Sequence, residues 1–180
     1  FTTDQVAKLE TTDLALLADT QIQALTTAQV AAFTTNQIQA LTTAQVDKLS
    51  AVQIKALTTA QISGFETTDI KVLDDTQIKA LTSSQIKALT TAQIHVLDET
   101  QIKSLTTVQI ANLETTDLAV LETTQIQALT TTQVVALTTT QIQELSTVQI
   151  HALDATQVKS LTAAQVAKLE TTDLVALDTT

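Results

Sequence analysis

The sequence predicts an all-α protein, a superhelical α-solenoid with one short capped helix in every eight residues. Three observations indicate this fold class. Hydrophobic residues recur at two fixed positions of an unbroken eight-residue repeat, capping residues precede each expected helix, and the helix formers Ala, Leu, Gln and Lys fill much of the remainder. The 180 residues include one Gly and no Pro, so the residues that usually mark long loops are nearly absent.

The repeat is an octad, whose positions we label a to h with Phe1 at position a. Position a is always Leu or Phe, position f is always Ile, Val or Leu, and the register never shifts. Residues 1–176 make 176/8 = 22 octads, and four residues of the next octad follow. We therefore expect residues 1–180 to form a single continuous array. Because both ends stop inside the pattern, we also expect it to be a segment of a longer array.

The expected helix starts are marked by capping boxes. Position b is usually Thr, Ser or Asp, and Gln follows three residues later at position e, as in Thr26 with Gln29 and Thr42 with Gln45. In a capping box the first side chain accepts from the backbone of the third helical residue, whose own side chain reaches back. The helix should then run from position c to the next position a, about two turns.

Four octads carry Glu at position b and Asp at position e. Because Glu is a poor N-cap, we expect the cap in these octads to move one residue along the chain. The expected caps are then Thr11, Thr67, Thr115 and Thr171.

Positions f and the following a are three residues apart, so they share one face of a helix and form the predicted core. Two buried aliphatic side chains stabilise an octad by roughly 3–6 kcal/mol. Ordering eight backbone residues costs roughly 8–16 kcal/mol, so each octad depends on its neighbours. Phe1, Phe33 and Phe65 are 32 residues apart, which is consistent with four octads per superhelical turn. The predicted structural core includes Leu25, Val30, Phe33, Ile38, Leu41, Ile94 and Leu97.

A β-solenoid is the alternative fold, because Thr, Val and Ile favour strands. However, positions a and f are separated by five and then three residues, and two-residue alternation would place them on opposite faces of a sheet. A single unbroken helix is disfavoured more strongly. Eight residues advance such a helix by about 800°, so the hydrophobic stripe would drift by about 80° in each octad.

Composition excludes several classes of function. A net charge of −10 without any Arg argues against nucleic acid as a partner, and the absence of Cys excludes disulfides and zinc–thiolate sites. No hydrophobic run is long enough for membrane insertion. His95 and His151 occupy the variable position g, and the acidic pairs Asp74-Asp75 and Asp98-Glu99 stand at helix entries. We therefore expect no enzyme, and no catalytic, cofactor or metal site.

The octad itself is similar to a known class of repeat. Units such as Leu25-Thr26-Thr27-Ala28-Gln29-Val30 and Leu41-Thr42-Thr43-Ala44-Gln45-Val46 resemble the L-T-x-x-Q-[IV] tandem repeats of very long bacterial surface and secreted proteins. This resemblance covers the whole chain. It implies an extracellular or cell-surface location and a role in an adhesin-like stalk or filament.

The expected function is therefore that of a non-enzymatic structural repeat protein, an extracellular stalk, spacer or filament subunit. Such a chain would associate end to end or continue into a longer chain. The alternative function is a binding module, in which the solenoid holds a partner protein or peptide.

Overall fold

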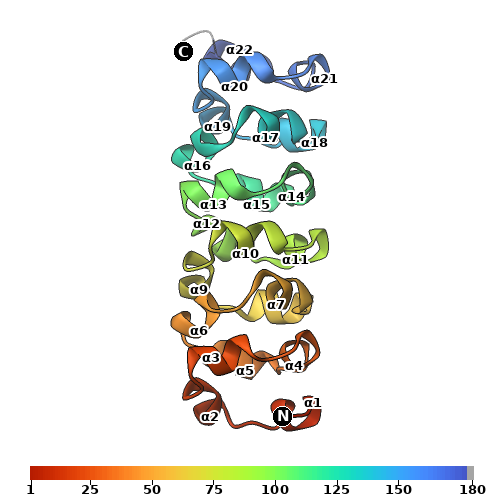
Figure 1. Cartoon of the computed structure of the whole chain (residues 1–180). Helices are drawn as coiled ribbons and strands as arrows, with labels where there is room; N and C mark the ends of the chain where they lie inside the picture. Colours follow the sequence, from red (N-terminus) through yellow and green to blue (C-terminus); the bar gives the residue numbers. More distant parts are fainter. Residues whose placement is uncertain (178–180) are drawn as a thin grey trace. The chain divides into compact units, whose positions relative to one another are not determined.

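The computed structural model describes residues 1–177, and within that range it contains 22 short α-helices and no strand. The all-α solenoid is confirmed, and the β-solenoid alternative is wrong. The chain divides into two compact units, Phe1–Val96 with helices α1–α12 and Leu97–Thr180 with helices α13–α22 (Figure 1).

The helices of the first unit are α1 (Thr3–Ala7), α2 (Thr11–Ala15), α3 (Asp19–Gln23), α4 (Thr27–Ala31), α5 (Thr35–Ala40), α6 (Thr43–Asp47), α7 (Ala51–Ala56), α8 (Thr59–Gly64), α9 (Thr67–Lys71), α10 (Asp75–Ala80), α11 (Ser83–Ala88) and α12 (Thr91–His95). Those of the second unit are α13 (Glu99–Ser104), α14 (Thr107–Asn112), α15 (Thr115–Ala119), α16 (Thr123–Ala128), α17 (Thr131–Ala136), α18 (Thr139–Gln143), α19 (Thr147–His151), α20 (Ala155–Ser160), α21 (Ala163–Val166) and α22 (Thr171–Leu177).

Most helices are shorter than the sequence analysis predicted, at five or six residues, or about one and a half turns. After the six-residue helix α5 the chain is extended at Leu41 (φ −62°, ψ 138°) and again at Thr42 (φ −74°, ψ 153°). Two consecutive extended residues are enough to redirect the chain into the next helix. No residue in the described range has a positive φ, so these corners need neither Gly nor Pro.

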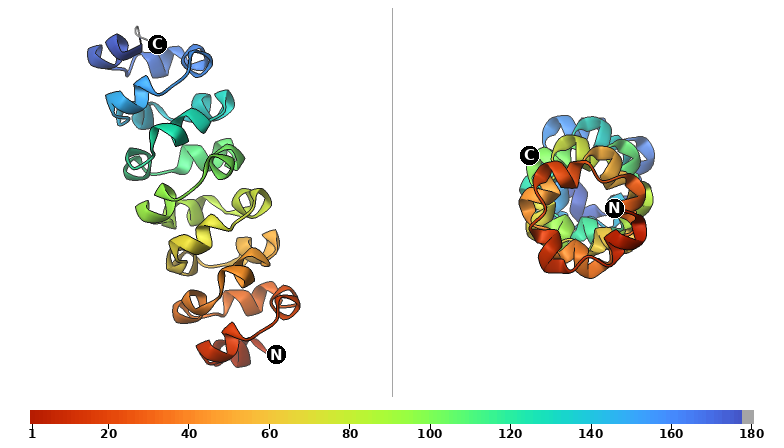
Figure 2. Two further views of the ribbon diagram at one scale, coloured as in Figure 1. Left: turned by 90° about the vertical axis from the view of Figure 1, so that its left-hand side faces the viewer. Right: turned by 60° about the horizontal axis from the view of Figure 1, so that its bottom comes forward.

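Within each unit, a helix packs against the helix three places further along the chain. In Phe1–Val96 the pairs run from α1 with α4 to α9 with α12, and in Leu97–Thr180 they run from α13 with α16 to α19 with α22. In both views of Figure 2 the successive helices of Phe1–Val96 follow one another around a coil. This packing places octads of one turn directly beside octads of the turn before.

Most hydrophobic side chains at positions a and f are buried between the turns, whereas Phe1, Val166 and Leu174, near the ends of the chain, are exposed. The seven residues predicted as structural core are all buried, with side chains no more than 8% exposed: Leu25, Val30, Phe33, Ile38, Leu41, Ile94 and Leu97.

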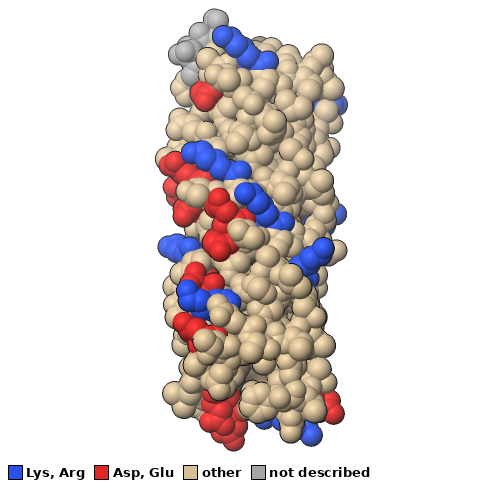
Figure 3. Space-filling view, viewed as in Figure 1, with Lys and Arg blue, Asp and Glu red and all other residues tan. Residues whose placement is uncertain are grey.

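Most charged residues lie outside this core, whereas Asp69, Asp117 and Asp173 are buried. On the face shown in Figure 3, acidic and basic side chains are interspersed, and uncharged side chains cover wide areas between them. Within residues 1–177, no helix combines the length and the apolar character needed to cross a membrane.

Candidate functional site: glutamines that join successive turns

The glutamine at position e first closes a capping box on its own helix. The Thr26 N–H donates to Gln29 Oε1 at 2.7 Å, and the Gln29 N–H donates to Thr26 Oγ1 at 3.3 Å. Thr42 and Gln45 make the same two bonds, at 3.0 and 3.2 Å. The four residues named as helix caps in the sequence analysis therefore lie at the starts of α4 and α6, in reciprocal contact.

The same side chain also bonds to the preceding turn of the coil. Gln85 Nε2 donates to the carbonyl oxygens of Ile54 and Leu57, both at 2.8 Å. These two residues lie 31 and 28 positions earlier, at the end of α7, where the Ile54 carbonyl also accepts from the Leu57 N–H at 3.2 Å. One glutamine thus caps the start of its own helix and the end of another.

We call these residues bracket glutamines, and their geometry is nearly constant. Each donates from Nε2 to a position-f carbonyl 31 residues earlier and a position-a carbonyl 28 residues earlier, at 2.7–3.2 Å. Those with both bonds inside one unit are Gln37, Gln45, Gln53, Gln61, Gln77, Gln85 and Gln93, and Gln133, Gln141, Gln149, Gln157 and Gln165.

The spacing of these bonds defines the superhelical turn. Separations of 28 and 31 residues correspond to 28/8 = 3.5 and 31/8 = 3.9 octads. A turn within each unit therefore contains between three and four octads, slightly fewer than the four suggested by the phenylalanine spacing. The glutamine of each bracket lies over the junction between two octads of the turn before, where a position-f and a position-a carbonyl accept its two bonds.

The side chains of the bracket glutamines are buried, and their polar atoms all have hydrogen-bond partners. Their exposed fractions are 2–4%, and in the described part of the chain no buried side-chain nitrogen or oxygen lacks a hydrogen-bond partner. A buried hydrogen bond contributes about 0.5–1.5 kcal/mol when made, and leaving its partner unpaired costs about 1–3 kcal/mol. The brackets therefore fix the register of the turns more strongly than they add to net stability.

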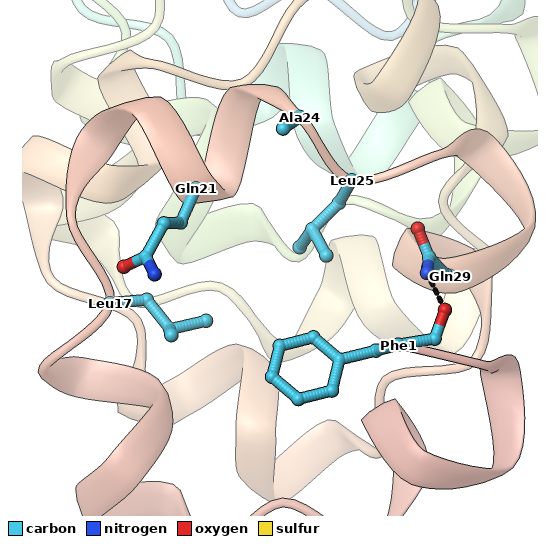
Figure 4. A pocket seen from close by; sticks show the side chains of 6 residues that line it. All are labelled: Phe1, Leu17, Gln21, Ala24, Leu25 and Gln29. Carbon is cyan, nitrogen blue, oxygen red and sulfur yellow. Dashed lines mark hydrogen bonds between the residues drawn. The ribbon is translucent and has the colours of Figure 1, made fainter.

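Figure 4 shows Gln29, which makes only the position-a half of such a bracket. Gln29 Nε2 donates to the carbonyl oxygen of Phe1, and the Phe1 ring lies near the side chains of Leu17 and Leu25. Leu17, Leu25 and Phe1 all occupy position a. Apolar side chains thus gather beside the glutamine that joins the two turns.

Four octads depart from this pattern and carry Asp where the bracket glutamine would be. At α9 the Glu66 side chain makes no capping bond, whereas the Glu66 N–H donates to Asp69 Oδ2 at 3.1 Å. Because this bond keeps Glu66 as the N-cap, the prediction that the cap moves to the next Thr is wrong. The residues proposed as caps are instead the first residues of α2, α9, α15 and α22: Thr11, Thr67, Thr115 and Thr171.

Asp69 is buried, with only 2% of its surface exposed. Burial raises the pKa of the Asp69 carboxyl to about 6; the hydrogen bond from the Glu66 backbone opposes this rise and the Glu66 charge adds to it. Burial also raises the pKa of Asp117, which stands in the same kind of octad. A carboxylate has no hydrogen to donate. Among the described contacts, Asp69 makes none with the carbonyl groups of Ile38 and Leu41, 31 and 28 residues before it.

The other polar residues considered from the sequence lie at exposed or capping positions. His95 and His151 are exposed at the ends of α12 and α19. Asp74 and Asp98 cap α10 and α13 by accepting from the backbone of the glutamine three residues on. Within residues 1–177, no three His, Cys, Asp or Glu side chains gather closely enough to hold a metal ion.

The repeats identify the family of the chain. The model of the ALTTAQ repeat matches residues 6–43, 38–67, 70–107, 83–115 and 110–147, which together make up more than half of the sequence. The chain therefore belongs to the ALTTAQ repeat family, and the tandem repeat inferred from the octads is confirmed. Comparison with curated proteins gave no match.

The bracketing role of glutamine was missed in the sequence analysis, although the sequence carries a signal for it. A capping box accepts Glu as readily as Gln at its third helical position. Position e nevertheless is Gln in 22 − 4 = 18 octads and never Glu. An amide that must both accept and donate explains this choice.

Proposed function

We propose that this chain is a non-enzymatic structural spacer, part of an extracellular stalk or filament on a bacterial surface. The observation that carries the proposal is the bracket glutamine, a buried side chain that joins two successive turns in most octads. The extracellular and bacterial setting is supported by the resemblance of the octads to the repeats of long bacterial surface proteins.

The brackets suit a spacer because they are local. Each connects an octad only to the turn before it, so an array of this kind gains length by adding octads without new types of contact. The stability of such an array is approximately a sum of repeat and nearest-neighbour terms. A protein that sets a distance needs this property, whereas a catalytic site needs a singular group of residues.

The brackets also support end-to-end association of copies as part of the proposal. Every turn offers amide donors toward one end of the coil and carbonyl acceptors toward the other. Two different surfaces that fit each other make a heterologous contact, which extends as an open assembly unless the rotation closes a ring. A filament and a longer covalent array would thus use the same contact.

Stretching the full chain by both termini in optical tweezers tests the spacer role. Because neighbouring octads stabilise each other locally, we expect reversible unravelling in small steps. Each released octad adds roughly 25 Å of extended chain. Removing one bracket with Gln85→Leu should lower the force at which the affected turns open, whereas Gln39→Leu at an exposed position g should not.

Two results would argue against a spacer. One is extension of the chain without measurable resistance at low force. The other is an identical force response for Gln85→Leu and Gln39→Leu, which would mean that the brackets do not hold the turns under load.

A further inference from the structure

We propose that Asp69 is a pH-sensitive joint between two turns of the unit Phe1–Val96. When its carboxyl is neutral, α9 closes on the turn before it, and when the carboxyl is charged, this contact is loosened. The joint is independent of the proposed spacer role, since it depends only on the local packing of α9.

The geometry places Asp69 where the neighbouring octads place an amide donor. One octad earlier, Gln61 Nε2 donates to Val30 and Phe33 at 3.0 and 2.7 Å. One octad later, Gln77 Nε2 donates to Val46 and Leu49 at 3.2 and 2.7 Å. The intervening octad carries the buried Asp69 carboxylate at this position of the repeat. In this octad, therefore, the two inter-turn hydrogen bonds of a bracket glutamine are replaced by a buried carboxylate, which can only accept.

The surroundings of Asp69 do little to neutralise its charge. The one described hydrogen bond of the Asp69 side chain is from the Glu66 N–H, and the Glu66 carboxylate lies at the same helix start. On α6, which packs against α9, Asp47 is paired with Lys48 at 2.7 Å. Helices α5 and α8 carry no titratable side chain. The remaining charged or titratable groups on α9, on the adjacent α10 and on α12, which also packs against α9, are Lys71, Asp74, Asp75, Lys79 and His95.

Protonation of Asp69 changes both its buried charge and its lack of a hydrogen-bond donor. It removes the buried charge, and it gives the carboxyl an O–H that can donate toward the carbonyl groups of the preceding turn. Because the pKa of Asp69 is raised from 3.8 to about 6 in the folded chain, folding favours the protonated form. The resulting stabilisation is fully present below about pH 4 and is lost as the pH rises through about 6.

The first test is a carbon-detected NMR titration of the aspartate carboxyl groups in the full chain. Asp69 should titrate near pH 6, well above the ordinary aspartate value of 3.8. In parallel, urea unfolding of the wild type should show this joint raising the unfolding constant by about tenfold between pH 5 and pH 7.5. Asp69→Gln, which restores the bracket amide, should remove that tenfold contribution and be more stable than the wild type at pH 7.5.

The matched control is Asp75→Asn, which removes the same charge from the exposed first residue of α10. It should leave the pH dependence of unfolding as in the wild type. The proposal is overturned if Asp69 titrates near the ordinary aspartate value of 3.8, or if Asp69→Gln keeps the wild-type pH dependence.

Discussion

Replacing Gln85 by glutamate will lower the free energy of unfolding of the full chain by about 3–5 kcal/mol at neutral pH. Glutamate has nearly the same shape and keeps the oxygen that accepts from the Thr82 N–H at 2.7 Å. It loses the two amide hydrogens that Gln85 donates to Ile54 and Leu57, and it points a buried charge at their carbonyl oxygens. The substitution therefore removes the inter-turn bonds of Gln85 while keeping its capping-box bond to Thr82.

The measurement is urea unfolding of the 180-residue chain at pH 7.5, with Gln39→Glu as the matched control. Gln39 is exposed at position g, so the same chemical change there should alter stability by less than about 0.5 kcal/mol. Similar losses for the two variants would mean that the inter-turn bonds of Gln85 do not hold the fold together.

The second large effect is expected in the hydrophobic core. Ile86→Asp should destabilise the chain by more than about 4 kcal/mol, because the fully buried Ile86 would be replaced by an unpaired charge. Lys87→Ala, at the neighbouring exposed position g, should change stability by less than about 0.5 kcal/mol. Denaturant unfolding of both variants is the measurement. Comparable losses would show that positions f and g have been assigned to the wrong faces.

The local structure of this protein follows closely from its sequence. Cap residues such as Thr26 and Thr42, and core residues such as Val30 and Ile38, are set by contacts within one octad or across one helix face. Such signals repeat in phase along the chain, so each copy reinforces the same interpretation.

The number of octads per turn, and hence which residues meet between turns, could not be derived from the sequence in the same way. It depends on the backbone angles at residues such as Leu41 and Thr42, and small changes there, added over several octads, alter the number of helices per turn. The three phenylalanines gave a spacing of 32 residues, whereas the bonds of Gln85 span 28 and 31. Without that spacing, the partners of the glutamine amide could not be named, so its second role was missed.

The prediction of the helix caps in the four octads with Glu and Asp was wrong for a related reason. Glu66 is a poor capping residue by itself, which made Thr67 the expected cap. The decisive contact is the hydrogen bond from the Glu66 N–H to the Asp69 side chain. This is the half of the capping box that the third helical residue makes, and preferences for the N-cap side chain do not include it. The burial of Asp69 is also invisible in a single octad, because it comes from packing between turns.

The central claim, that bracket glutamines join the turns, is tested most directly by NMR measurement of hydrogen exchange at glutamine side-chain amides in the full chain. Both Nε2 hydrogens of residues such as Gln53, Gln85 and Gln141 are bonded to buried carbonyl groups, so they should exchange slowly. The exposed position-g residues Gln39 and Gln143 should exchange at the rate of free amides. Uniformly fast exchange of all glutamine side chains would contradict the account.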